Sequence, residues 1–123
     1  MAATVLFVED NTDTRVVLSR LLRKCGWNVL DFPDAENALE GMPKSGVDLA
    51  LLDIRLPGMW GDELARRLRV SWPKMPVAFV TAEPRDATEA RLHDLTDCRV
   101  IHKPVQVDRL LTALSEEVAR GRG

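Results

Sequence analysis

Five short runs of apolar residues, separated by amphipathic stretches, constrain the fold of this chain more than any other feature. The runs lie at residues 5–8, 29–30, 49–52, 77–80 and 100–101. Several of them lack the polar–apolar alternation of a half-exposed strand, which is typical of strands that are buried on both faces of a parallel sheet. We therefore expect five buried strands, each followed by a helix.

Capping and helix-breaking residues predict where the intervening helices begin and end. Asn11 or Thr12 can cap the first helix, which Gly26 should stop, and Asp34 can cap the second. Pro84 suits the first turn of the fourth helix. The apolar residues expected to face the core from the first, fourth and fifth helices are Val17, Leu18, Leu21, Leu22 and Cys25, then Ala87, Ala90, Leu92 and Leu95, and finally Val107, Leu110, Leu111, Leu114 and Val118.

A β-α unit repeated five times predicts an α/β fold, namely a three-layer (βα)5 doubly wound sandwich with a five-stranded parallel sheet and right-handed crossovers. The chain has 123 residues, of which 46% are hydrophobic and 29% are charged, and this suits a single domain over residues 1–123. In such folds ligands bind beyond the carboxyl ends of the strands.

Charge and composition argue against several classes of function. A net charge of −2 does not favour nucleic-acid binding, and no run approaches the ~20 apolar residues of a membrane span. No basic stretch precedes an apolar one near the N-terminus, so we do not expect a signal peptide. We expect the protein to be cytoplasmic. Cys25 and Cys98 lack zinc-site spacing, and we expect both to be free, mostly buried thiols.

The residues that directly follow the apolar runs carry the chemistry. Glu9 and Asp10 follow the first run, Asp53 the third, Thr81 the fourth and Lys103 the fifth. Carboxylates brought to one edge of a sheet repel one another and favour a bound cation, for which magnesium is a natural choice. A lysine beside such a cation indicates that an anion binds there too, and an aspartate can attack phosphorus as a nucleophile.

Four segments with this spacing resemble the signatures of bacterial response-regulator receiver domains. They are Val8–Asn11, Leu52–Gly61, Val80–Ala82 and His102–Pro104. The resemblance extends over essentially the whole chain. It implies a flavodoxin-like fold with strand order 2-1-3-4-5 and a role in two-component or phosphorelay signalling.

The resemblance also implies a role for each matching residue. Asp53 would be phosphorylated by a sensor histidine kinase or a histidine phosphotransfer protein. Together with Asp53, Asp10 would bind Mg²⁺ directly, Glu9 through water, and Arg55 through its backbone carbonyl, while Lys103 would contact the phosphoryl group. Such a domain is a signalling phosphoacceptor that assists its own phosphorylation and dephosphorylation, and we expect it not to be a classical enzyme.

Further implied features concern access and switching. Thr81 would reach toward the bound phosphoryl group, and the small Ala82 would leave that group accessible. The Lys103–Pro104 peptide bond is expected to be cis. The surface made by the fourth helix, fifth strand and fifth helix would change on phosphorylation and contact a downstream partner, with the protein a monomer or weak dimer and no direct contact to nucleic acid or membrane.

The chain also departs from the family pattern. Val100 stands where relatives carry Tyr or Phe, and valine is too small to swing between a buried and an exposed position; switching should therefore be shallower or use backbone and loop shifts. Residues 95–98 replace a turn of small residues, which suggests a specialised partner. Trp60 could reach the site but is more simply explained as packing on the third helix, and neither His93 nor His102 is expected to take part in the chemistry.

Three other functions stay open from the residues alone. A phosphohydrolase with Asp53 as nucleophile would usually carry a second acid two residues later, where this chain has Arg55. A flavin- or dinucleotide-binding domain would need a G-x-G-x-x-G motif after the first strand, which the sequence lacks. A phosphorylation-independent interaction module is suggested by Val100.

Overall fold

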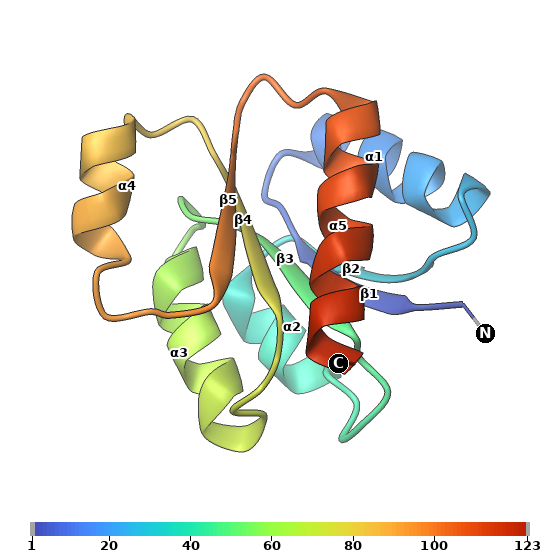
Figure 1. The fold of residues 1–123 in the computed structure, drawn as a ribbon, viewed down its shortest axis with the longest axis horizontal. Coiled ribbons are helices and arrows are strands. Elements are labelled where there is room, and N and C mark those ends of the chain that lie inside the picture. The colour runs from blue at the N-terminus through green and yellow to red at the C-terminus, as the bar shows by residue number, and fades with distance from the viewer. Residues whose placement is uncertain (1, 123) are drawn as a thin grey trace.

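The computed structural model describes residues 2–122 and shows five strands that alternate with five helices (Figure 1). The elements are β1 (Thr4–Val8), α1 (Thr12–Lys24), β2 (Asn28–Phe32), α2 (Ala35–Gly41), β3 (Leu49–Asp53), α3 (Gly61–Ser71), β4 (Val77–Thr81), α4 (Arg85–Arg91), β5 (Cys98–His102) and α5 (Val107–Arg122). All four strand pairings are parallel and the order is β2-β1-β3-β4-β5. The predicted fold class and strand order are confirmed.

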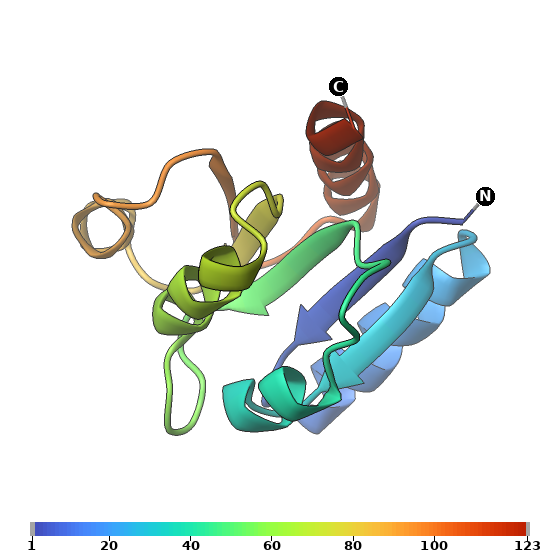
Figure 2. The same ribbon diagram turned by 90° about the horizontal axis from the view of Figure 1, so that it is seen from below.

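Two apolar cores lie on opposite faces of the sheet (Figure 2). Helices α1 and α5 cover one face, where Phe7, Leu22 and Leu114 are buried together. Helices α2 and α3 cover the other face, where Leu52, Leu64 and Phe79 are buried. Strands β3 and β4 are buried at every position, which explains why their sequences are continuously apolar rather than alternating.

The helix ends follow the predicted capping residues. The side chain of Asn11 accepts a hydrogen bond from the Thr14 backbone N–H at 2.9 Å, so Asn11 rather than Thr12 is the N-cap of α1. Asp34 caps α2 in the same way through Asn37 at 2.7 Å. Helix α1 ends just before Gly26, whose φ of 94° is readily adopted only by glycine.

Three predictions of burial on α1 and α5 are wrong. Val17 is 55% exposed and Val107 is 37% exposed, and Cys25 is exposed as well. On α1 the buried stripe runs through Leu18 and Leu22, and Val17 is turned away from it by about 100°. Cys25 stands at the C-cap of α1, where the helix ends in solvent.

Helix α4 also differs from its prediction. Ala87 and Ala90 are exposed, and the residue of this helix that is buried is Thr88. Thr88 tolerates burial because its hydroxyl donates a hydrogen bond to the Pro84 carbonyl at 3.0 Å. The helix ends at Arg91, so Leu92 is buried from the turn that follows rather than from the helix itself.

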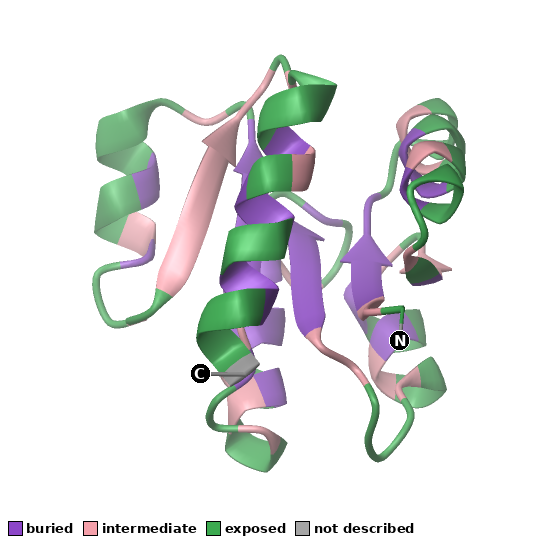
Figure 3. Ribbon diagram, turned by 45° about the vertical axis from the view of Figure 1, so that its right-hand side comes forward, coloured by how far each residue is buried: buried purple, intermediate pink, exposed green. Residues whose placement is uncertain are grey.

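The β5 edge of the sheet is the least covered part of the core. Each of its five residues is half-buried, in contrast to the buried strands β3 and β4 (Figure 3). Helices α4 and α5 flank this strand without closing over it (Figure 1). Among the helices of residues 2–122, none combines the length and the apolar character needed to cross a membrane.

Candidate functional site

Three acidic side chains meet at the carboxyl ends of β1 and β3. Val8 pairs with Leu52 in the sheet, so Glu9 and Asp53, the next residues along each strand, lie side by side. One carboxylate oxygen each from Glu9, Asp10 and Asp53 can be chosen so that all lie within 4.8 Å of one another. Glu9 and Asp53 are buried and Asp10 is exposed, which leaves the cluster open to solvent on one side.

The ammonium group of Lys103 lies against two of these acids. Its Nζ donates hydrogen bonds to Asp53 Oδ2 at 3.1 Å and to Glu9 Oε1 at 3.2 Å. The backbone of Lys103 is held in turn by β4, because its N–H donates to the carbonyl of Thr81 at 2.8 Å. Strand pairing therefore brings residues from opposite ends of the chain into one site.

Thr81 ends β4 beside this group and is buried. Its hydroxyl oxygen accepts a hydrogen bond from the backbone N–H of Glu83 at 2.9 Å, which leaves its own proton available to a further acceptor. Ala82, the next residue, is exposed, and it adds little bulk at the rim of the site.

The crowding of acids affects their protonation. Burial, together with repulsion from the Asp53 carboxylate, raises the pKa of Glu9 from 4.5 to about 7, against the opposing effects of the Asn11 backbone N–H and of Lys103. Burial by itself lowers the pKa of Lys103, but its hydrogen bonds and attraction to Asp53 and Glu9 raise that pKa overall. The site thus has more negative charge than Lys103 alone neutralises.

A close backbone crossing holds the loop that follows β3. The Gly61 N–H donates to the carbonyl of Ile54 at 2.8 Å, and a Cβ atom on Gly61 would lie 2.0 Å from the carbonyl oxygen of Asp53. Only glycine fits there. The backbone N–H of Arg55 donates to Asp53 Oδ1 at 3.2 Å, so this loop also holds the side chain of Asp53.

The donor set fits a divalent cation such as Mg²⁺. Carboxylate oxygens from Glu9, Asp10 and Asp53 are the hard ligands that Mg²⁺ prefers, and a partly open site leaves room for the waters that it retains. Burial raises the pKa of Glu9 first and repulsion from the Asp53 carboxylate raises it further, and a bound cation would relieve that repulsion. The residues present are therefore suited to this ion.

Residues of the fifth strand and the loop after it occupy the places expected from the sequence. The Lys103–Pro104 peptide bond is cis, as predicted. Val100 is half-buried and packs against the core on the α3 side of the sheet. His102 pairs with Thr81 in the sheet, and His93 is exposed. In the turn 95–98, Asp97 has a φ of 53°.

The sequence did not point to a set of charged contacts beside the site. The guanidinium carbon of Arg91 lies 4.0 Å from the centre of the Trp60 ring, and that of Arg55 lies 5.4 Å from it. Arg55 also forms an ion pair with Glu83 at 3.5 Å. Trp60 packs on the core as expected, but it also meets two cations. No local sequence pattern predicts the contact between Arg91 and Trp60, because the two residues are far apart along the chain.

A shallow groove of about 470 Å³ opens beside Lys103, between α1 and the loop that precedes α5. Val17, Leu21 and Pro104 contribute apolar surface to it. Val17, whose exposure the sequence did not predict, therefore lines a groove that Lys103 of the site also lines.

Comparison with known proteins agrees with this geometry. The sequence profile of the response regulator receiver domain matches residues 5–115. The chain is 32% identical over 118 residues to the sensory transduction protein RegX3 of Mycolicibacterium smegmatis, covering 96% of this chain and 51% of that protein. It is 30% identical over 112 residues to the response regulator receiver protein CpdR of Brucella abortus, covering 91% of this chain and 93% of that protein.

A solved structure shows the same fold over almost the full length. The CheY-like receiver domain protein of Methanospirillum hungatei superimposes with a TM-score of 0.90 at 25% identity, covering 99% of this chain and 98% of that one. The chain thus spans about half the length of RegX3 but nearly all of CpdR. On the family-wide match and on the fold, this chain belongs to the response regulator receiver domains of two-component signalling.

Proposed function

We propose that this chain is a phosphoacceptor that takes a phosphoryl group onto Asp53 from a sensor histidine kinase or a histidine phosphotransfer protein. The observation that carries the proposal is the meeting of Asp53 with two further acids and with the ammonium of Lys103 at 3.1 Å. A lysine among carboxylates serves little purpose in metal binding alone, but it suits a site that receives both a cation and a phosphoryl group.

In the transfer step, a carboxylate oxygen of Asp53 attacks the phosphorus atom of a phosphohistidine. The new P–O bond forms as the P–N bond breaks, the electron pair stays on the imidazole nitrogen, and that nitrogen takes a proton from solvent. A magnesium ion held by Glu9, Asp10, Asp53 and the carbonyl of Arg55 would neutralise charge on the phosphoryl oxygens.

Lys103 and Thr81 complete the site. Lys103 exchanges its hydrogen bond to Asp53 Oδ2 for one to a phosphoryl oxygen. The hydroxyl of Thr81 donates a hydrogen bond to a second phosphoryl oxygen. Hydrolysis of the aspartyl phosphate by water at the same site would reset the domain. This is a signalling cycle and does not require sustained turnover of a substrate.

The surroundings of the site suit a protein donor. The small exposed Ala82 leaves space for an incoming imidazole, and the apolar groove that includes Val17 and Pro104 lies beside Lys103. A donor protein that reaches Asp53 would therefore contact this groove. A cytoplasmic location, where such donors act, is part of the same proposal.

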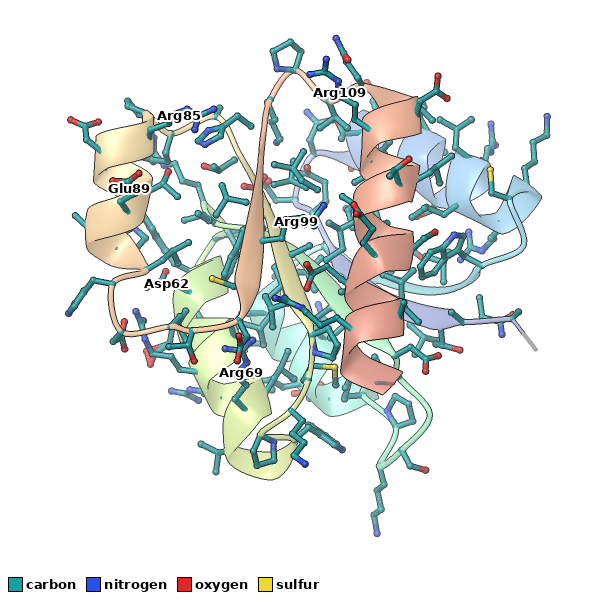
Figure 4. The ribbon with its side chains drawn as sticks, in the orientation of Figure 1. Asp62, Arg69, Arg85, Glu89, Arg99 and Arg109 are labelled. Atoms are coloured by element: carbon teal, nitrogen blue, oxygen red, sulfur yellow. The ribbon has the colours of Figure 1, made fainter. Side chains whose placement is uncertain are left out.

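The output surface is proposed to be the α4-β5-α5 face. Strand β5 is half-buried along its whole length, and charged side chains such as Arg85, Glu89 and Arg109 project around it (Figure 4). A downstream partner would bind there after phosphorylation, with the domain itself a monomer or weak dimer.

Acetyl phosphate with Mg²⁺ tests the proposal directly. Intact-mass measurement should show the gain of one phosphoryl group, abolished in Asp53→Asn and by chelation of the metal, and retained in Asp13→Asn, which alters an exposed acid on α1. Continuous release of phosphate at a high rate would indicate a phosphohydrolase instead. A protein that folds yet gains no phosphoryl group would refute the proposal and favour a phosphorylation-independent interaction module.

A further inference from the structure

Side chains of α3 contact both the end of helix α4 and the turn that follows it. Helix α4 is a seven-residue helix in which only Thr88 is buried. Arg66 of α3 donates to both carboxylate oxygens of Asp94 at 2.9 Å and to the carbonyl of Arg91 at 3.0 Å. An element with so little buried apolar surface is free to shift when those contacts change.

Arg91, at the end of α4, contacts two residues of the segment that follows Asp53. Its guanidinium lies 4.0 Å from the centre of the Trp60 ring and 3.8 Å from Asp62 Oδ1. Asp62 is buried and lies where the beginning of α3 meets the end of α4 (Figure 4). Arg91 is therefore held by a ring and a carboxylate that both belong to the segment leading away from Asp53.

An unbroken series of contacts joins this ring to the proposed phosphorylation site. The backbone N–H of Arg55 donates to Asp53 Oδ1 at 3.2 Å, and the guanidinium of Arg55 lies 5.4 Å from the centre of the Trp60 ring. Trp60 is the N-cap residue of α3 but makes no side-chain capping bond. Its side chain is thus available for contacts other than helix capping, and the guanidinium groups of Arg55 and Arg91 both lie over its ring.

We propose that the stacking of Arg91 on Trp60 is the contact through which occupancy of the Asp53 site repositions α4. This inference rests on the proposed function. A phosphoryl group on Asp53 changes the carboxylate to which the Arg55 backbone N–H is hydrogen-bonded, and so shifts the Arg55 main chain. Because the Arg55 guanidinium lies over the Trp60 ring, that shift changes the position of the ring. A cation–ring contact depends on distance and orientation, so a small movement of Trp60 changes how firmly Arg91 is held. Val100 is a short, half-buried side chain and cannot swing in the way this requires.

Hydrogen exchange of the amides in α4 tests the inference, with Mg²⁺ and beryllofluoride as the probe that mimics the phosphoryl group. The wild-type protein should show a change in exchange over residues 85–92 on binding. Arg91→Gln and Trp60→Ala should still bind beryllofluoride but lose most of that change. Trp60→Phe, which keeps a ring, should retain the larger part of it, and Arg67→Gln, which alters an exposed arginine on the neighbouring helix α3, should retain all of it.

A second measurement does not depend on disrupting α4. In the double variant Trp27→Phe/Trp72→Phe, Trp60 is the remaining tryptophan, and its emission should shift when Mg²⁺ and beryllofluoride bind. Emission that stays constant, or an α4 response that is undiminished in Arg91→Gln, would overturn the inference while leaving the phosphoacceptor role intact. Failure of the wild-type protein to bind beryllofluoride would contradict both.

Discussion

Glu9 is buried beside the Asp53 carboxylate, and this should make the metal-free protein less stable as the pH rises. Glu9 is 2% exposed, and burial with repulsion from Asp53 raises its pKa from 4.5 to about 7. In the unfolded chain the same side chain returns to its ordinary pKa. The folded state therefore binds a proton that the unfolded state has already released over the interval between these two values.

The sign and size follow from this difference in proton binding. Below about pH 4.5 Glu9 is protonated in both states and its contribution to stability is fully present; that contribution declines as the pH rises and is gone above about pH 7. A tenfold change in proton affinity is worth about 1.4 kcal/mol, so the loss is on the order of 3 kcal/mol. Glu9→Gln removes the titrating group but keeps a side chain of similar shape.

Urea denaturation in the presence of a chelator measures the effect. The free energy of unfolding of Glu9→Gln minus that of wild type should increase by about 3 kcal/mol between acidic and mildly alkaline pH. Glu40→Gln, which alters an exposed glutamate on α2, should show no such trend. Added Mg²⁺ should stabilise the wild type most at the higher pH, since the cation favours ionised Glu9. A difference that is flat across this range would refute the placement of Glu9 in a crowded acidic pocket.

Two backbone features give further predictions. Gly61→Ala should lower the free energy of unfolding, measured by urea denaturation, by more than about 3 kcal/mol, because its Cβ would lie 2.0 Å from the Asp53 carbonyl oxygen. Gly26 has a φ of 94° but no atom within 4 Å of an added Cβ, so Gly26→Ala should lower that free energy by only about 1–2 kcal/mol. Equal losses in the two variants would contradict the close crossing at Gly61. Asn11→Ala should lower the midpoint of denaturation by the equivalent of about 1 kcal/mol through loss of the Asn11–Thr14 cap, and an unchanged midpoint would show that this cap does not stabilise α1.

Much of this molecule could be predicted from the sequence because its signals are local. The apolar runs show no alternation since β3 and β4 are covered on both faces, and Asn11 and Asp34 cap helices through bonds that span three residues. Parallel strands end at one edge of the sheet, so the residues after each run could be assigned to a common site before any coordinates were known.

Tertiary structure alone decided which surfaces are covered and which residues far apart in the sequence come into contact. The periodicity of α1 cannot tell Val17 from its buried neighbours, since both are apolar and only the packing of α1 against the sheet leaves Val17 exposed. Likewise the approach of Arg91 to Trp60 at 4.0 Å joins elements that no short-range pattern connects. Burial and through-space electrostatics depend on what lies across from a residue, and that is a property of the folded chain rather than of any segment of its sequence.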